Sequence, residues 1–333
     1  MDAPPPPIQM VQLLAGFQVS QALYAAAKLG IPDLLADGPQ TAAQVAHARQ
    51  LNEASTARLM RSLTGFGVLA SDGDGYRLTP LGDTLRSDAP GSMRNLALMW
   101  METHYLPFAG LTDTVRTGNV AATEHYGMPF FAWLSGDHDR VAQFSGAMAN
   151  LTDGIKAHAI AGYDFGAPSL ITDLGGADGT LLAMILGRLP DTAGVVLDLP
   201  HVVSAVPTVA KEHGLDDRLT GQPGDFFEAV PPSEVYVMSM VLHDWSDAEA
   251  LTLLRNIASA AEPGAQIRAF ELVVPPGDAP HMSKMVDLTM LAITTGRERD
   301  ETELRELFTA AGLVFDGIVA TPTPLSVVEA HVA

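Results

Sequence analysis

The stretch from Leu170 to Leu186 constrains the fold of this chain more than any other. A short apolar run that ends near an acid, 170–174, predicts a buried strand, and the apolar run 181–186 predicts a helix. Gly175, Gly176 and Gly179 lie between them. Strand, glycine turn and helix open a doubly wound α/β sheet, and ligands bind at such turns. Glycine permits positive φ and close approach, and a helix N-terminus offers free N–H groups to an anion.

The glycine spacing limits what this turn can be. It is G-G-x-x-G, which differs from the G-x-G-x-x-G of dinucleotide-binding enzymes. An ordinary tight turn with a surface acid therefore stays open as an alternative at this point. A nicotinamide oxidoreductase on a similar sheet is a second alternative, and the spacing counts against it.

Composition excludes several classes of protein. The chain has 333 residues, 47% of them hydrophobic, which is enough for a large core and about two domains. Its formal net charge of -20 argues against nucleic acid or an anionic membrane as partner, since both require a basic surface. The lack of cysteine excludes disulfides, thiolate metal ligands and cysteine nucleophiles. No apolar segment reaches transmembrane length, and residues 1–7 do not resemble a signal peptide, so we expect a cytoplasmic enzyme.

The first 95 residues predict a small helical domain with a hairpin. Proline-rich residues 1–7 are expected to be disordered, and residues 8–29 predict one apolar helix that a second subunit would bury. Capping signals at Thr41, Asn52 and Thr79 each precede a predicted helix. The segment 68–78 predicts a hairpin. Three helices followed by a two-stranded wing are typical of a winged helix.

A winged helix can bind DNA, but the charges here favour another role. The helix that would enter a groove, 52–66, has only Arg58 and Arg61 as cations, and the wing carries Asp72 and Asp74. We therefore expect a dimerisation module, with a winged-helix regulator as the alternative.

Residues 96–160 predict a helical linker that is rich in methionine and aromatic side chains. Such side chains usually pack in a core, but they also line pockets for flat aromatic ligands. We therefore expect this segment to contribute to a substrate pocket through Trp100, Phe144 and Met148.

Residues 161–333 alternate strands and helices. Strands are predicted at 170–174, 194–198, 235–242 and 267–274, and the runs 313–320 and 325–332 predict a final hairpin. The hairpin would give the parallel sheet an antiparallel edge. The fold class is α/β, a Rossmann-like domain behind a helical winged-helix domain.

Three acids follow three successive strands, which suggests a nucleoside ligand. Asp198 lies 25 residues after Asp173, near the offset of a ribose-binding acid. Asp225 could accept from an adenine amine while Phe226 packs on the base. S-adenosylmethionine has this shape, with ribose hydroxyls, an adenine amine, a sulfonium and an amino-acid tail.

His243 is the candidate general base. It follows a predicted strand, where open α/β sheets hold their sites, and an imidazole suits proton transfer at neutral pH. Asp244 or another carboxylate could hold its tautomer. A lone histidine can equally be a packed or surface side chain, and Glu271 and Glu298 can be solvated acids.

Together these motifs resemble the S-adenosylmethionine-dependent O-methyltransferases of the plant caffeate and bacterial antibiotic type. The resemblance runs from about residue 11 to residue 332. It rests on six short motifs that follow one another in the order found in the family, at residues 173–179, 197–200, 224–227, 242–245, 287–291 and 296–299. The resemblance implies a Rossmann-like domain with a mostly parallel seven-stranded sheet, and a homodimer formed by the N-terminal domain. It also implies secondary metabolism as the setting and an aromatic acceptor as the substrate.

The resemblance also assigns roles to single residues. It makes His243 the base, flanked by Glu271, Glu298 and Asp244, with no metal. The implied donor contacts are Asp173, Gly175, Gly176, Gly179, Asp198, Leu199, Gly224, Asp225, Phe226 and Ser239, and Asp287 and Met290 join the substrate pocket. Ala177 replaces the usual third glycine, and Ser239 stands where plant members carry lysine. A hydroxylase or decarboxylase on this scaffold, using the donor without methyl transfer, is the alternative within the fold.

Overall fold

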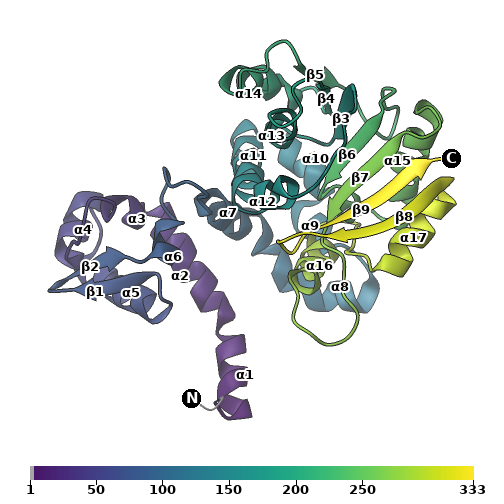
Figure 1. The fold of residues 1–333 in the computed structure, drawn as a ribbon. Helices are drawn as coiled ribbons and strands as arrows, with labels where there is room; N and C mark the ends of the chain where they lie inside the picture. The colour runs from purple at the N-terminus through teal and green to yellow at the C-terminus, as the bar shows by residue number, and fades with distance from the viewer. Residues whose placement is uncertain (1–3) are drawn as a thin grey trace. The chain divides into compact units, whose positions relative to one another are not determined.

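The computed structural model describes residues 4–333, and within them the chain divides into two compact units. Unit 1 comprises the residues up to Leu106 together with His138–Gly154, and unit 2 comprises Pro107–Asp137 and Ile155–Ala333 (Figure 1). The domain boundaries that the sequence predicts after residues 95 and 160 stay predictions.

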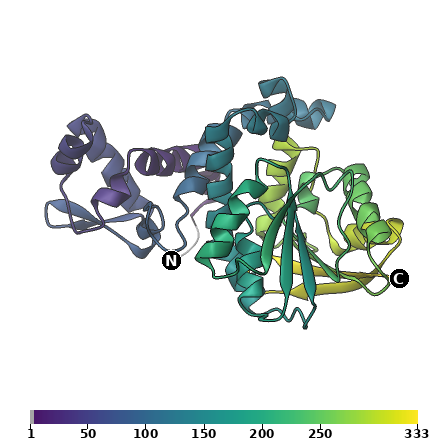
Figure 2. The same cartoon turned by 90° about the horizontal axis from the view of Figure 1, so that it is seen from above.

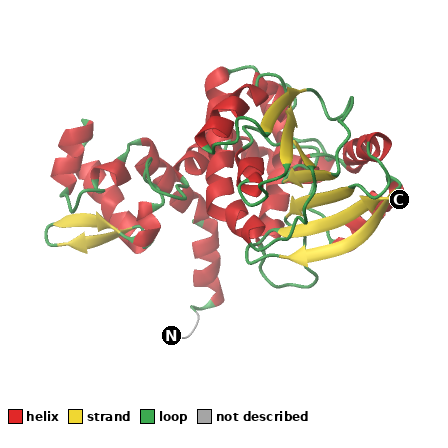
Figure 3. Ribbon diagram, turned by 45° about the horizontal axis from the view of Figure 1, so that its top comes forward, coloured by secondary structure: helices red, strands yellow, loops and turns green. Residues whose placement is uncertain are grey.

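Unit 1 is helical, with one small two-stranded hairpin among its described residues. Figure 3 draws this hairpin in yellow beside the red helices of the unit. Its first elements are α1 (Pro6–Leu14), α2 (Gly16–Lys28), α3 (Ile31–Leu34), α4 (Ala42–Arg49), α5 (Glu53–Gly65), β1 (Leu69–Asp72), β2 (Gly75–Leu78) and α6 (Pro80–Asp83). After them come α7 (Arg94–Met99), a π-helical turn (Trp100–His104) and α11 (His138–Leu151).

Local signals predicted most of unit 1 correctly. Thr41 and Gln44 form a capping box, Asn52 accepts from the N–H of Ser55 at 2.9 Å, and Thr79 caps the helix that begins at Pro80. The hairpin pairs β1 with β2 antiparallel, as expected. These features were predictable because each depends on residues a few positions apart.

The N-terminal helix differs from its prediction in two ways. Residues 8–29 form two helices rather than one, because the first ends at Leu14 and the second begins at Gly16, a residue with poor helix propensity. The first helix already begins at Pro6, since proline has no N–H that the first turn would leave unpaired. Disorder over 4–7 was therefore wrong in part, and residues 1–3 lie outside the described residues.

Unit 2 contains the predicted α/β domain. Within the described residues its sheet has seven strands in the order β5-β4-β3-β6-β7-β9-β8, parallel up to β7 and antiparallel at the β9-β8 edge. The strands are β3 (Leu170–Leu174), β4 (Ala193–Asp198), β5 (Leu219–Pro223), β6 (Val235–Ser239), β7 (Gln266–Glu271), β8 (Leu313–Ala320) and β9 (Ser326–Val332).

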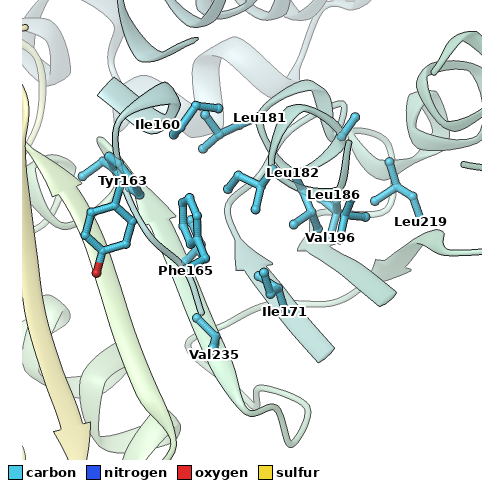
Figure 4. Packing of buried hydrophobic residues seen from close by; sticks show 14 of the residues in the cluster. Ile160, Tyr163, Phe165, Ile171, Leu181, Leu182, Leu186, Val196, Leu219 and Val235 are labelled. Carbon is cyan, nitrogen blue, oxygen red and sulfur yellow. The ribbon is translucent and has the colours of Figure 1, made fainter. Parts of the chain in front are cut away.

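Helices lie on both faces of this sheet, as Figure 2 shows. Val235 and Val237 of β6 join one buried cluster, and Tyr236 and Met238 join the other, so alternate side chains face opposite cores. Helices α12 (Ala157–Ala161), α13 (Thr180–Leu186) and α14 (Val206–Glu212) supply the first cluster, part of which Figure 4 shows. Helices α15 (Asp247–Ala260) and α17 (Glu301–Ala310) supply the second.

The remaining α-helices of unit 2 are α8 (Leu111–Thr117), α9 (Ala121–Tyr126), α10 (Phe130–Ser135) and α16 (Met282–Ile293).

No helix among residues 4–333 combines the length and the hydrophobicity that a membrane span requires. The parallel order β5-β4-β3-β6-β7 brings the carboxyl ends of five strands to one edge, where the predicted site residues follow them.

Candidate active site

The glycine turn after β3 is a strained loop that is tied to the next strand. Gly175, Ala177 and Gly179 have φ of 70°, 52° and 85°, in the left-handed region that glycine favours. The Asp198 carboxylate at the end of β4 accepts from the N–H groups of Ala177 at 3.0 Å and Leu199 at 2.7 Å. Asp198 therefore holds the turn in place, and Ala177 keeps the conformation expected of a glycine.

Asp173 lies at the end of β3 with one oxygen unpaired. Its side chain is buried, and Oδ2 has no hydrogen-bond partner among the described residues. A Cβ on Gly176 would lie 2.4 Å from that oxygen, so only glycine leaves it open to the turn. Burial raises the pKa of Asp173 to about 7, although the Lys156 ammonium opposes the shift.

The turn after β5 places aromatic rings near the same edge. Asp225 accepts from the N–H of Phe227 at 2.8 Å, and Asn256 of α15 donates to the carbonyls of Phe226 and Phe227. The Gly224 N–H donates to the Asp198 carbonyl at 3.0 Å. The Trp245 ring packs edge-on against Phe227. Asp225 and Phe226 thus occupy a loop joined directly to the glycine turn through Asp198.

The chain turns sharply after β6, and this corrects two predicted strands. β6 ends at Ser239 rather than Leu242, because Met240, whose N–H still donates to the Phe270 carbonyl, has a φ of 57° and directs the chain away from β7. The Glu271 carboxylate accepts the freed N–H groups of Val241 at 3.2 Å and Leu242 at 2.9 Å. β7 ends at Glu271 itself rather than at Val274. A Cβ on Gly175 would lie 3.1 Å from Val241, so the turns after β3 and β6 touch.

This turn buries His243 against a carboxylate from a distant loop. The His243 Nδ1 and Glu298 Oε1 lie 2.7 Å apart, and both side chains are buried. The Asp244 oxygen is 3.7 Å from Nε2, too far for a hydrogen bond. With Nδ1–H donating to Glu298, the neutral ring has its lone pair on Nε2.

The carboxylates around His243 determine its charge. Burial lowers the pKa of His243, but Asp244, Glu298 and Glu271 raise it, and the outcome is a pKa of about 10. For the neighbouring acids burial acts in the opposite direction, and it raises the pKa of Asp244 to about 6 and that of Glu271 to about 7. The surrounding carboxylates therefore favour the protonated form of the imidazole.

Sequence reasoning assigned no role to two buried cations, Arg299 and Lys156. Arg299 donates to the carbonyls of Leu242 and Trp245 and pairs with Asp247, so it clamps the Glu298 loop to the His243 turn. Lys156 is buried and donates to the Ser239 carbonyl at 3.5 Å. A lone lysine such as Lys156 belongs to no motif, so burial is its only signal. Arg299 lies within the motif 296–299, but the motif does not reveal which groups it bonds.

Three possible metal-ligand side chains lie together, although the resemblance implies no metal. His243, Glu271 and Glu298 each place one possible ligand atom within 4.8 Å of the others. Their sequence spacing hides this, since they come from three elements. Glu271 already accepts from two backbone N–H groups, and Nδ1 of His243 already bonds Glu298, so hydrogen bonding accounts for the arrangement.

The predicted substrate-pocket residues divide between the units. In unit 1, Trp100 is 43% exposed, and Phe144 and Met148 pack on a small cluster with Leu96 and Met99. In unit 2, Asp287 of α16 accepts from the Glu298 N–H at 2.9 Å, and Met290 is buried. Asp287 therefore positions the Glu298 loop. Contact of these five residues with an acceptor stays a prediction.

Comparison with known proteins now places this geometry in a family. A family model for an O-methyltransferase domain matches residues 108–314, and a model for an O-methyltransferase dimerisation domain matches residues 11–88. The phenazine O-methyltransferase of Lysobacter antibioticus is 35% identical over 324 residues, covering 97% of this chain and 95% of the relative.

Two solved structures are similar along nearly the whole chain. One is an O-methyltransferase from neocarzinostatin biosynthesis, solved with S-adenosylmethionine and 2-hydroxy-5-methyl naphthoic acid; it has a TM-score of 0.81, 34% identity and coverage of 95% of this chain and 96% of that one. The other is the 8-amino-8-demethyl-D-riboflavin dimethyltransferase of Streptomyces davawensis, with a TM-score of 0.82, 31% identity and coverage of 99% and 100%. On the family models and the near full-length relative, this chain belongs to the O-methyltransferase family.

Proposed function

We propose that this enzyme transfers a methyl group from S-adenosylmethionine to a hydroxyl of an aromatic natural product, phenolic, quinone or polycyclic, with His243 as general base. The observation that carries the proposal is the buried 2.7 Å contact between His243 Nδ1 and Glu298. Because Nδ1 faces Glu298, Nε2 points away from that carboxylate. His243 lies on the turn after β6, which touches the glycine turn at Val241. The relatives that act on aromatic compounds support the acceptor class.

The residues at the sheet edge fit the methyl donor. The glycine turn leaves Asp173 Oδ2 open, and each Asp198 oxygen keeps a lone pair for a ribose hydroxyl after accepting one backbone N–H. Asp225 and Phe226 suit an adenine amine and its ring face. S-adenosylmethionine supplies an electrophilic methyl group on a sulfonium and leaves as S-adenosylhomocysteine.

The residues of the His243 turn supply the acid–base chemistry. Nε2 accepts the proton of the acceptor hydroxyl as its oxygen bonds to the methyl carbon and the carbon–sulfur bond breaks. Glu298 holds the ring orientation, and Asp244 and Glu271 stabilise the imidazolium that forms. A phenol with a pKa near that of tyrosine, about 10, needs only such assistance.

A base must be neutral before it accepts a proton, and the acids around His243 oppose this. A positive charge bound in the same pocket lowers the pKa of His243, because two like charges repel. A cationic donor therefore prepares the base in the complex where it acts.

An amino group is a second acceptor to consider, because one similar structure is a dimethyltransferase of an aminoriboflavin. A neutral amine already carries a lone pair for attack, whereas a phenol becomes a strong nucleophile only as its proton leaves. The placed base therefore favours a hydroxyl. Testing phenolic, quinone, phenazine and arylamine acceptors with labelled donor separates the two.

We also propose that the chain forms a homodimer through unit 1. Its dimerisation family model begins within α1, whose large apolar side chains are unusually exposed. Ile8, Met10, Val11, Leu13 and Leu14 are between 52% and 75% exposed. Large apolar side chains exposed along one helix are typical of a protein–protein interface.

Replacing the base tests the mechanism directly. His243→Ala is expected to lower kcat about 100-fold or more, because proton transfer to a placed group contributes at least that much. The affinity for S-adenosylhomocysteine in calorimetry should stay within about twofold of the native value. The control is His213→Ala, at an exposed position. Normal turnover in the His243 variant would reject the assignment.

The effect of Glu298 on the pKa of His243 should appear in the pH dependence of kcat/KM. Below its pKa His243 already carries a proton, so kcat/KM rises with pH until the ring is neutral. Glu298→Gln removes a carboxylate that raises this pKa, while its amide oxygen can still accept Nδ1–H. The rising limb should move to lower pH by about one unit or more. The control is Glu306→Gln, at an exposed position, which should leave the pH profile unchanged. An unchanged profile in Glu298→Gln would show that Glu298 does not act on His243.

The ribose role of Asp198 is tested by binding alone. Asp198→Ala should weaken S-adenosylhomocysteine binding about tenfold or more, because it removes charged hydrogen bonds and releases the glycine turn at Ala177. The exposed Asp191→Ala serves as the control. An unchanged dissociation constant in calorimetry would remove Asp198 from the donor site.

The dimer predicts a single-residue effect in unit 1. Leu13 is 75% exposed, and Leu13→Glu is expected to shift light scattering at micromolar concentration from dimer toward monomer, since it buries a charge in an apolar interface. Val115→Glu, at a residue 71% exposed in unit 2, should leave the dimer intact. A native chain that scatters as a monomer contradicts the proposal.

A further inference from the structure

Lys156 is a buried cation that the mechanism above leaves unused. It is the last residue of a π-helical turn, Thr152–Lys156, directly before α12. The whole residue is 7% exposed. An ammonium has three hydrogens to donate, yet the described contact is one long bond of 3.5 Å to the Ser239 carbonyl. A π-helical turn often marks a functional position, because it reorients one side chain.

Other buried polar atoms at the same edge also lack partners within residues 4–333. They are Asp173 Oδ2, Ser239 Oγ and Glu271 Oε2, at the ends of the adjacent strands β3, β6 and β7. Buried polar atoms in proteins nearly always have a partner. A group of them around a poorly paired ammonium therefore indicates a polar ligand that supplies the missing bonds.

The charges around Lys156 indicate what kind of ligand this is. Burial lowers the pKa of Lys156, while Asp173, Glu271, Asp244 and Asp178 raise it, with Asp173 first among them. Among residues 4–333 no ion pair within 4.0 Å joins Lys156 to Asp173. A carboxylate and an ammonium that face one site without pairing are complementary to an α-amino acid, which carries one group of each sign.

We propose that Lys156 binds the carboxylate of the donor's amino-acid tail, next to Asp173, which takes the tail's ammonium. The inference rests on the proposed function, in which S-adenosylmethionine is the donor. The donor is favoured over an acceptor carboxylate because Asp173 Oδ2 opens toward the glycine turn at Gly176. Lys156 is then a donor-positioning residue contributed from outside the strand-and-turn motifs.

Calorimetry with three ligands tests this without turnover. The ligands are S-adenosylhomocysteine, its decarboxylated analogue, and 5′-methylthioadenosine, which lacks the whole tail. Lys156→Met should weaken binding of S-adenosylhomocysteine about tenfold or more and change binding of 5′-methylthioadenosine less than about twofold. The native enzyme should prefer S-adenosylhomocysteine over the decarboxylated analogue by a factor that Lys156→Met abolishes.

Two controls keep the result interpretable. Lys211→Met, at an exposed position in α14, should behave as the native enzyme with all three ligands. Lys156→Gln removes the charge but keeps a donor, and it should show the same ligand pattern if the methionine variant fails to fold.

The other outcomes separate the failure of this inference from the failure of the proposed function. Unchanged affinity for S-adenosylhomocysteine in both Lys156 variants, with a raised KM for the acceptor, would assign Lys156 to the acceptor and overturn the inference. An equal loss of affinity for all three ligands would show a general distortion of the site and would overturn it as well. If the native enzyme bound none of them, the proposed function itself would be wrong.

Discussion

The Glu271 carboxylate is the interaction on which the rest of the site depends. By accepting from Val241 and Leu242 it satisfies two backbone donors that leave the sheet where β6 ends. Without such an acceptor, two buried N–H groups would each cost about 1–3 kcal/mol. The strand can therefore stop at Ser239, the chain can take a positive φ at Met240, and the turn that carries His243 can form. Arg299 then fixes the turn from the other side by bonding the carbonyls of Leu242 and Trp245.

The site contains more acid than base, and this suits a cationic ligand. Asp173, Glu271 and Glu298 are buried close to His243 and Lys156, in a chain whose formal net charge is -20. Charged groups interact more strongly at such an edge than in water, so a sulfonium is held more firmly than the neutral thioether that replaces it. In the proposed reaction the same acids attract the donor, favour the imidazolium and weaken the hold on the product.

Sequence reasoning succeeded where the cause was local. The capping residues Thr41, Asn52 and Thr79 act within four positions, and the strand, glycine turn and helix at 170–186 depend on neighbouring residues. Parallel order at one sheet edge then brought the acids after successive strands together, as the fold class implies. The helix break at Ala15, by contrast, is a single-residue event inside an apolar run, and periodicity cannot locate it.

The parts that sequence reasoning missed depend on contacts between distant residues. β6 was predicted three residues too long because the apolar character of Met240–Leu242 does not reveal that a carboxylate 29 or 30 positions later captures two of their N–H groups. Lys156 and Arg299 received no role from the sequence, since only the folded chain shows that they are buried. The pairing of His243 with Glu298 spans 55 positions and was reached through the family resemblance rather than through spacing.

Ala177 shows how one strained residue can be kept at a binding turn. A left-handed conformation costs a residue with a Cβ about 1–2 kcal/mol, which glycine avoids. Here the Ala177 N–H donates to Asp198 at 3.0 Å, a bond to a charged acceptor that contributes about 1.5–3 kcal/mol and offsets the strain. The same carboxylate also accepts from Leu199, so the loop and the strand end are held together before any ligand arrives. A turn fixed in this way loses little further freedom on binding, and that is why an alanine can stand where the resembling family usually has glycine.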